Sequence, residues 1–396
     1  MANPYRILTL NKISNQGLKR FPAAAYQIGN DVVEPDAILV RSQVMHDMLI
    51  PASVKAIARA GAGTNNVPVA RMSACGVPVF NAAGANANAV KELVIAGMLL
   101  AARNIVPAVE FVAGLQGDDA TQHKLVEDGK KHYAGIELRG RTLGIIGLGA
   151  IGRLVADTAL GLGMRVYGFD PNITVEGAWS LSSQVKKAAS IEELLKHSDF
   201  VTLHVPLLDE TRGLINEVRI KAMKSGSVLL NFSRDAIVDS DAVLAGLQAK
   251  HLRSYVCDFP SQKLQGQAHV VTLPHLGAST EEAEENCAVM VVDQVREYLE
   301  HGNITNTVNF PSVVMPRESA YRLAVANANV PNMLGQISTT LATAGINIRT
   351  MMNKSRGEMA YTLVDTDSAV PAELIAQIEA ISGVLMVRNL PLPDAQ

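Results

Sequence analysis

The segment TLGIIGLGAIGRLVADTALGLGMRVYGFD, Thr142–Asp170, constrains the fold more than any other part of the chain. An apolar strand enters a turn with three glycines, and a helix and a second strand follow; the glycines are Gly147, Gly149 and Gly152. In dinucleotide-binding sheets these glycines permit a tight turn, close approach of a pyrophosphate and close packing of the helix. The pyrophosphate lies at the helix N-terminus, here at Ala150 and Ile151. The segment therefore predicts a dinucleotide site on a Rossmann-type sheet.

Asp170 bears on which dinucleotide is bound. It ends the second strand, 18 residues after Gly152, where a carboxylate holds the hydroxyls of the adenine ribose. Its charge repels the 2′-phosphate of NADP, and Pro171 and Asn172 supply no compensating cation. The sequence therefore favours NAD.

Short apolar runs alternate with helical patterns on both sides of this segment, which predicts parallel sheets. Earlier strands are expected at Tyr5–Leu10, Ala37–Val40, Lys55–Ala58 and Val77–Phe80. Later strands are expected at Phe200–Val205, Ser227–Phe232, Ser254–Cys257 and Val270–Leu273. We expect an α/β protein with two doubly wound domains. Residues 97–281 form a Rossmann-type cofactor domain, and residues 1–96, completed by 282–312, form a discontinuous flavodoxin-like substrate domain.

The last part of the chain changes character. Asn306–Pro316 has the composition of a linker. Beyond it, strand and helix patterns follow in the order βαββαβ over about 70 residues, which is typical of a ferredoxin-like unit. We expect this unit at residues 319–396.

Composition and charge exclude several classes of protein. Of the 396 residues, 48% are hydrophobic and 18% charged, which rules out a disordered or fibrous chain. A net charge of −3 lacks the basic excess of nucleic-acid binders. The longest apolar stretch, Leu93–Ala102, is shorter than the roughly 20 residues of a membrane span. The N-terminus shows no secretory signal, and the three scattered cysteines form no disulfide framework or metal cluster. We expect a cytoplasmic protein without a bound metal.

Several segments together resemble the D-isomer-specific 2-hydroxyacid dehydrogenases. They are RAGAGTNNV (Arg59–Val67), NANAVKELV (Asn86–Val94), ELRGRTLGIIGLGAIG (Glu137–Gly152), LHVPLLDETRGLIN (Leu203–Asn216), LLNFSRDAIVD (Leu229–Asp239) and LPHLGAST (Leu273–Thr280). The tail NANVPNMLGQI…AGINI resembles an ACT domain. Within the family, the chain looks like the branch that oxidises D-3-phosphoglycerate and carries a C-terminal ACT domain. The resemblance covers nearly all of the chain.

The resemblance assigns the chemistry to an arginine and a histidine. Arg234 lies just past a predicted strand end, where ligands bind in such sheets. Its guanidinium can grip a carboxylate and polarise the reacting oxygen. His275 follows another strand, and an imidazole can take the hydroxyl proton because it titrates near neutral pH.

The chain departs from the family at the partner of this histidine. The family writes D-V-F-x-x-E-P, and its Glu pairs with the catalytic His. Here the stretch is CDFPSQK, and alignment on Phe259 puts Gln262 at the Glu position; a shift by one residue would put Lys263 there. A Gln oxygen can still orient the ring, although it supplies no negative charge. The formate dehydrogenase branch also uses Gln, so we expect Gln262 to orient His275.

For the substrate, the resemblance implies three sets of contacts. Backbone amides of Ala62 and Gly63 hold the carboxylate, Asn86 contacts the substrate, and Arg41 faces the phosphate. A second arginine often follows two residues after the first, and Gln43 stands there in this chain. The basic run Lys130–His132 could add charge, or it could be an ordinary solvated run.

The resemblance also implies further contacts with the cofactor and with an effector. The additional cofactor contacts are His204, Pro206, Thr211, Ser233, Asp258 and Gly277. Asp258 is displaced by one position from the family's cofactor-proximal Asp. Asn329 and Asn347 match asparagines that bind serine between two ACT domains, and Asn327 stands where some relatives have His. A purely structural dimerisation module is the alternative.

These features predict one function and leave two alternatives open. The predicted function is NAD-dependent oxidation of D-3-phosphoglycerate to 3-phosphohydroxypyruvate, the first step of L-serine biosynthesis, regulated by serine in a homodimer or homotetramer. No nucleic-acid or membrane partner is expected. The first alternative is another D-2-hydroxyacid dehydrogenase, such as a hydroxypyruvate or glyoxylate reductase, which needs no amino-acid sensor. The second is a non-catalytic NAD-sensing protein of the same fold, which the missing Glu favours.

Overall fold

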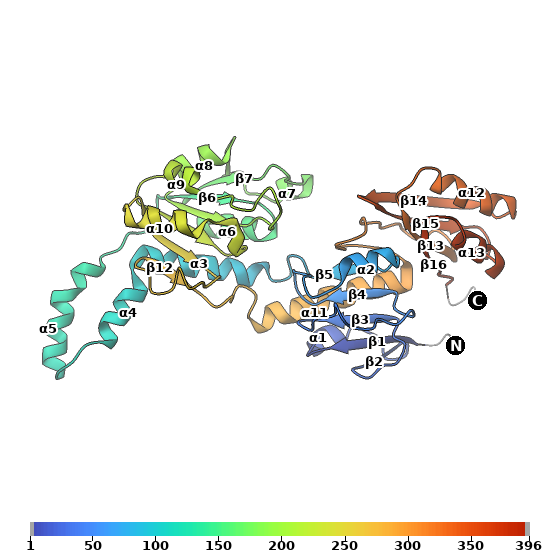
Figure 1. Cartoon of the computed structure of the whole chain (residues 1–396), viewed down its shortest axis with the longest axis horizontal. Helices are drawn as coiled ribbons and strands as arrows, with labels where there is room; N and C mark the ends of the chain where they lie inside the picture. Colours follow the sequence, from blue (N-terminus) through green and yellow to red (C-terminus); the bar gives the residue numbers. More distant parts are fainter. Residues whose placement is uncertain (1–3, 393–396) are drawn as a thin grey trace. The chain divides into compact units, whose positions relative to one another are not determined.

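The computed structural model describes residues 4–392, which form two compact units (Figure 1). One unit joins the residues up to Asn86 to those from Glu281 onward, and the other spans Ala87–Thr280. A discontinuous first unit is what a helix returning to the N-terminal sheet produces. The expected domain limit at residue 96 lies inside helix α3 (Ala87–Arg103), which belongs wholly to the second unit.

The unit Ala87–Thr280 contains a doubly wound parallel sheet. Its strands are β6 (Thr142–Ile146), β7 (Arg165–Phe169), β8 (Lys186–Lys187), β9 (Phe200–Leu203), β10 (Ser227–Asn231), β11 (Leu252–Cys257) and β12 (Val270–Thr272). They lie in the order β12-β11-β10-β9-β6-β7-β8, which is the Rossmann order with one more strand. The strand order reverses between β6 and β9, and ligands of such sheets bind outside the carboxyl ends at that point. The expected Rossmann-type sheet is confirmed.

Helices cover both faces of this sheet, because the central strands are buried along their whole length. Helix α3 and α6 (Ala150–Gly161) pack on one face. The other face carries α8 (Ile191–His197), α9 (Glu217–Ala222) and α10 (Ser240–Gln248), and a short helix α7 (Val175–Trp179) follows β7. The site-bearing loops therefore emerge from a rigid, close-packed core.

Two further helices stand away from the sheet of this unit (Figure 1). They are α4 (Ile105–Ala113) and α5 (Asp119–Gly129), followed by the 3₁₀ turn η1 (Lys130–Tyr133). Neither α4 nor α5 contains a buried residue. Within residues 4–392 no single helix is long and apolar enough to cross a membrane; only α3 and α4 taken together, bent by 66°, reach that length and composition.

The first unit contains a five-stranded parallel sheet. Its strands are β1 (Tyr5–Leu10), β2 (Tyr26–Gly29), β3 (Ala37–Val40), β4 (Ala56–Arg59) and β5 (Val79–Asn81), in the order β2-β1-β3-β4-β5. This is the expected flavodoxin-like order. Helices α1 (Asn15–Leu18) and α11 (Glu281–His301) pack on one face, and α2 (Val69–Ala74) packs on the other.

The C-terminal part of the same unit is a four-stranded antiparallel sheet. Its strands are β13 (Tyr321–Ala328), β14 (Ile348–Arg356), β15 (Met359–Thr366) and β16 (Val384–Asn389), in the order β14-β15-β13-β16. Helices α12 (Met333–Thr343) and α13 (Ala372–Glu379) cover one face. The expected βαββαβ unit is confirmed, and we refer to it as the ACT sheet with its two helices.

The other face of the ACT sheet packs on the parallel-sheet part of its unit. Ala324, Ala326 and Leu363 share one buried core with Tyr298 of α11 and Phe310. Residues 306–316, expected as a linker, belong to this core: Phe310, Val313 and Met315 are each at most 1% exposed. The expectation of a linker was therefore wrong, because the apolar residues of this stretch are buried between the two sheets.

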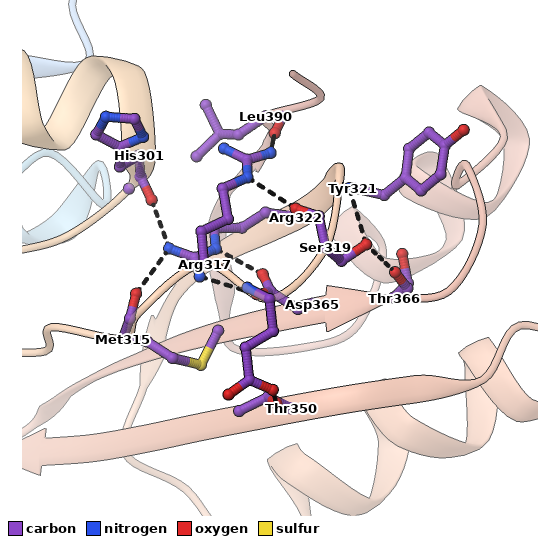
Figure 2. A network of polar contacts seen from close by, with 12 residues as sticks. His301, Met315, Arg317, Ser319, Tyr321, Arg322, Thr350, Asp365, Thr366 and Leu390 are labelled. Carbon is purple, nitrogen blue, oxygen red and sulfur yellow. Dashed lines mark hydrogen bonds and ion pairs between the residues drawn. The ribbon is translucent and has the colours of Figure 1, made fainter. Parts of the chain in front are cut away.

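A buried arginine joins the ACT sheet to the end of α11 (Figure 2). Arg322 donates to both carboxylate oxygens of Asp365, at 2.6 and 2.9 Å, and neither side chain is exposed to solvent. Arg322 also donates to the backbone carbonyl oxygens of His301, Met315 and Pro316. The carbonyl groups at a helix C-terminus lack partners within the helix. Arg322 therefore supplies a donor to the last residue of α11.

A second arginine acts in the same way. Arg388 of β16 donates to the carbonyl oxygens of Tyr298 and Leu299, at 2.7 and 2.8 Å. Its guanidinium lies 4.4 Å from the centre of the Tyr298 ring, within cation–π range. The hydroxyl of Tyr361 donates to the carbonyl oxygen of Gly302 at 2.7 Å. These contacts fix the C-terminal turn of α11 on the ACT sheet.

Candidate active site

The glycine turn between β6 and α6 has the shape that a pyrophosphate requires. Gly147 has φ +93°, and a Cβ there would lie 2.4 Å from the carbonyl oxygen of His204. A Cβ on Gly152 would lie 2.0 Å from the carbonyl oxygen of Gly147. Nothing lies within 4 Å of a Cβ built on Gly149, the residue before the first turn of α6. The turn is thus packed against backbone at Gly147 and Gly152 and open at Gly149, which leaves space for the pyrophosphate of NAD.

Asp170 lies beside this turn, as predicted, and is bound to the backbone. One carboxylate oxygen accepts the N–H of Leu148 at 2.8 Å, and the other accepts the N–H of Asn172 at 2.9 Å. The side chain is half-buried. Asp170 therefore supports the glycine turn itself, a role that the sequence did not predict.

The other predicted cofactor residues of this sheet lie at the carboxyl ends of β9 and β10. The Thr211 hydroxyl donates to the carbonyl oxygen of Pro206 at 2.6 Å, so these two form one turn after β9. The buried Ser233 hydroxyl donates to the carbonyl oxygen of Leu203 at 2.6 Å. His204 directly follows Leu203, and burial lowers the pKa of its ring to about 3. His204 is therefore neutral at physiological pH.

Arg234 lies on an exposed loop directly after β10, and the loop is held from below. Asn231, the last residue of β10, is fully buried. Its side-chain N–H donates to the carbonyl oxygen of Arg234 at 2.9 Å, and its side-chain oxygen accepts the N–H of Ser233 at 3.1 Å. Sequence reasoning missed Asn231, although a polar residue ending an otherwise apolar strand is a signal for such a role.

His275 lies on the loop after β12 and has an exposed side chain. Its ring meets the edge of the Phe259 ring, with the ring centres 5.2 Å apart and the planes at 61°. Gln262 does not join them: it is exposed, and no hydrogen bond links it to His275 in the described chain. Lys263, the other possible match, is paired with Asp241. The structure thus brings Phe259, and not Gln262, to the His275 ring.

Asp258 holds the same loop from within. It follows β11 directly and is 1% exposed. Its two carboxylate oxygens accept the N–H groups of Leu276 and Gly277, each at 2.7 Å. We expected Asp258 as a cofactor contact, but the structure shows both of its oxygens engaged by the histidine loop.

The predicted substrate residues lie at the carboxyl edge of the other parallel sheet. Arg41 follows β3, and its guanidinium is paired with Glu284 of α11. The carbonyl oxygen of Ala62, next to Gly63, accepts the side-chain N–H of Asn81 at 2.6 Å. Asn86 comes directly before α3 and is half-buried.

Sequence reasoning missed a second arginine at this edge. Arg59 ends β4 opposite Val40, and its Nε–H donates to the carbonyl oxygen of Arg41 at 3.0 Å. The signal was present in the RAGAGTNNV segment, at the end of a buried strand. Glu284 was missed as well, because only the return of α11 to this sheet brings it to Arg41.

The three predicted effector residues do not lie together. Asn329 and Asn347 are exposed and flank α12, one on each side. The side-chain N–H of Asn329 donates to the carbonyl oxygen of Gly357, and the backbone of Asn347 pairs with Asp367. Asn327 is 1% exposed inside the sheet, so it cannot contact a soluble ligand in this conformation.

Comparison with known proteins agrees with this geometry. The family model described as "D-isomer specific 2-hydroxyacid dehydrogenase, NAD binding domain" matches residues 95–278. D-3-phosphoglycerate dehydrogenase of Haemophilus influenzae is 33% identical over 341 residues, covering 83% of this chain and 79% of that protein. The enzyme of that name from Methanocaldococcus jannaschii is 34% identical over 373 residues, covering 90% of this chain and 68% of that protein.

A solved structure extends the likeness to three dimensions. The NAD⁺-bound 3-phosphoglycerate dehydrogenase of Entamoeba histolytica matches with a TM-score of 0.59 at 25% identity, covering 78% of this chain and 99% of that chain. The unit Ala87–Thr280, with its glycine turn and Asp170, is the NAD-binding domain. The chain belongs to the D-isomer-specific 2-hydroxyacid dehydrogenase family.

Proposed function

We propose that the protein oxidises D-3-phosphoglycerate to 3-phosphohydroxypyruvate with NAD, as the first step of L-serine biosynthesis. The observation that carries this proposal is the placement of Arg234 and His275 at the carboxyl edge of the sheet that forms the NAD site. The similarity to two D-3-phosphoglycerate dehydrogenases supports the choice of substrate.

The proposed chemistry uses few side chains. Bound NAD supplies the acceptor for the hydride that leaves C2 of the acid. Arg234 holds the carboxylate and polarises the C2 oxygen. His275 takes the hydroxyl proton on its ring nitrogen as the hydride leaves. Gln262 could orient the His275 ring only in a conformation that differs from this structure.

The pair of arginines at the other sheet edge supports recognition of a phosphate. Arg41 and Arg59 follow neighbouring strands and touch through the Arg41 carbonyl oxygen. Guanidinium groups suit phosphate because they can donate two parallel hydrogen bonds. Arg59 thus offers the second cation that Gln43 does not supply.

A panel of D-2-hydroxyacids tests this function. We expect the highest kcat/KM for D-3-phosphoglycerate, with D-glycerate and D-lactate lower by about a hundredfold or more, since a desolvated charge pair contributes several kcal/mol. Arg41→Gln should lower kcat/KM for the phosphorylated acid alone. Arg20→Gln, at an exposed arginine of the same unit paired with Asp293, is the control.

A preference for glyoxylate or hydroxypyruvate as substrates of reduction would favour the alternative reductase function. Absence of turnover with tight NAD binding would favour the NAD-sensing function.

We further propose serine as an effector of the ACT sheet. Asn329 and Asn347 flank an 11-residue helix, which spans about 16 Å. One small amino acid cannot touch both within one chain, so a clasp requires two ACT sheets side by side. Inhibition of turnover by serine, and its loss in Asn347→Ala, would support this; calorimetry without any heat of serine binding would contradict it.

We propose that the chain forms a homodimer or homotetramer in the cytoplasm, with one contact between copies through α4 and α5. Val109 and Val112 of α4 are 62% and 56% exposed, and Ile105 lies on the same groove. Apolar helices gain most of their stability from packing. A two-fold copy of the same helix pair would cover these side chains. The double substitution Val109→Asp with Val112→Asp should lower the oligomeric state in analytical ultracentrifugation, from dimer to monomer or from tetramer to dimer, and Val175→Asp, at an exposed valine of α7, should not.

A further inference from the structure

The carboxylate of Asp258 contacts the loop of His275 through hydrogen bonds from backbone N–H groups. Its carboxylate is buried at 1% exposure, and a buried carboxylate needs hydrogen-bond donors for its oxygens. The donors are the N–H groups of Leu276 and Gly277, the two residues directly after His275, each at 2.7 Å. The two oxygens are thus engaged by one short stretch of backbone.

We call these two hydrogen bonds the Asp258 clamp, and the backbone conformation of His275 indicates their role. His275 has φ +57°, a left-handed conformation that non-glycine residues rarely adopt. Such a conformation persists only where the surrounding structure over-determines it. The two hydrogen bonds from Asp258 begin at the very next residue, and hydrogen bonds to an ionised acceptor are the strong ones. They therefore hold the loop in the turn that aims the imidazole.

A hydrogen bond joins Asp258 to the seven-stranded sheet. Asp258 donates its own N–H to the carbonyl oxygen of Asn231 at 3.1 Å, and Asn231 holds the Arg234 loop through its side chain. Gly277 leaves the room required, because a Cβ there would lie 3.1 Å from the Asp258 carboxylate. Phe259, the next residue after Asp258, meets the imidazole edge-on. One turn thus fixes both the backbone and the ring of His275.

We propose that Asp258 is a positioning residue for His275, acting through the backbone of Leu276 and Gly277 and not through the cofactor. This rests on the proposed function, in which His275 moves the hydroxyl proton. In this proposal Asp258 gives the imidazole the orientation that family members obtain from a Glu side chain paired with the ring.

A double-mutant comparison in the full-length protein tests this role. Asp258→Asn keeps the shape but presents an NH₂ group to one of the two N–H donors, so one bond is lost. We expect kcat to fall by about tenfold to a hundredfold, the range for a misplaced catalytic group, with the Kd for NAD changed less than about twofold. In the His275→Ala background the same substitution should leave the residual rate unchanged, because the group it positions is gone. Equal losses in both backgrounds, or a matching loss of NAD affinity, would overturn the proposal.

Asp199→Asn is the matched control. Asp199 accepts the N–H of Thr142 at 2.9 Å and pairs with Lys224, at the amino edge of the same sheet. This control should lower the melting temperature without lowering kcat. Asp258→Ser, which has no NH₂ group, is a second test variant in case Asp258→Asn does not fold. Failure of both to fold would contradict the proposal, because Asp258 would then support the whole domain and not one loop.

Hydrogen exchange separates this proposal from the proposed function. In Asp258→Asn the amides of Leu276 and Gly277 should exchange faster, whether or not any substrate is found. Unchanged protection of these amides would overturn the clamp at any level of activity. Faster exchange in a protein that oxidises no hydroxyacid would support the clamp and contradict the function.

Discussion

Asp170 accepts the N–H of Leu148 at 2.8 Å, which supports the glycine turn. We propose that its charge also repels a 2′-phosphate, and these two roles predict different effects for two substitutions. Asp170→Asn removes the charge and can keep that bond. We expect the ratio of kcat/KM for NAD over NADP to narrow by about tenfold, equivalent to about 1.4 kcal/mol.

Asp170→Ala removes both tasks, so kcat/KM should also fall for NAD itself. Asp157→Asn, at an exposed carboxylate on α6, should leave the ratio unchanged. Equal ratios in the wild type and Asp170→Asn would mean that Asp170 acts only on the turn.

His204 makes the stability of the NAD-binding unit depend on acid. Burial lowers the pKa of His204 to about 3, below the 6.5 of a free imidazole. Between these values the unfolded chain binds one proton more than the folded chain, so stability falls as the pH drops through this range. From pH 7 to pH 5 this loss is about 2 kcal/mol in the NAD-free protein.

His204→Gln should therefore lose about 2 kcal/mol less than the wild type over the same interval, measured by urea unfolding. His123→Gln, at an exposed histidine of α5, is the control. An acid response of His204→Gln identical to that of the wild type would contradict the burial of a neutral ring.

At the scale of residues, the glycine turn and the loops of Arg234 and His275 could be predicted, because short motifs at strand ends encode them. The partners of these loops could not. Asp258 meets Gly277 only because β11 and β12 lie side by side, and Gln262 misses His275 because its turn points it to solvent. Such pairings depend on the ends of strands that are distant in the sequence.

At the scale of elements, the hold of the ACT sheet on α11 gives a strong prediction for stability. Arg322→Met leaves Asp365 as a buried carboxylate without its partner and leaves the carbonyl oxygen of His301 without its donor (Figure 2). Breaking a buried ion pair in this way costs about 3–5 kcal/mol. Denaturant unfolding of the unit that contains the five-stranded sheet and the ACT sheet should show this loss.

Arg349→Met is the control for that substitution, because Arg349 is an exposed arginine of β14. It should change the free energy of unfolding by less than about 0.5 kcal/mol. A comparable loss in both variants would show that the buried network contributes nothing specific.

The elements that could be predicted are those with strong apolar runs, such as β1, β6 and β10. Strand β2 was missed because it carries the short polar–apolar mixture YQIG. Helix α5 was missed because its residues are mostly polar and none is buried, so no core-facing stripe marks it. Helix α4 is apolar, but Pro107 near its start reads as a break in a helical pattern. The stretch 306–316 has the composition of a linker, and only the position of the ACT sheet shows that it is core.

At the scale of the whole molecule, removal of the ACT sheet should affect stability as well as the proposed inhibition by serine. Truncation after Pro316 leaves NAD binding intact, because Ala87–Thr280 is a separate compact unit. It also strips the cover from Tyr298, Leu299 and Phe310, which are at most 1% exposed in the full chain. The unit that contains the five-stranded sheet should therefore lose stability, and the proposed hydroxyacid oxidation should be lost with it.

Calorimetry of NAD binding and an assay of NADH formation on the truncated chain check this together. A truncated protein that oxidises its substrate at the full rate would contradict the structural role of the ACT sheet. The sequence could predict that such a sheet is present. Its packing on α11 could not be predicted, because the apolar pattern of each segment does not show which surface it packs against.

We propose that Arg234 and His275, beside the NAD site, promote hydride transfer from a D-2-hydroxyacid to NAD. The most direct measurement is the initial rate of NADH formation from D-3-phosphoglycerate and from its L enantiomer. The wild type should oxidise the D enantiomer only, and His275→Asn and Arg234→Gln should each lower kcat by at least about a hundredfold while NAD still binds. Turnover that survives both substitutions, or equal rates with the two enantiomers, would contradict it.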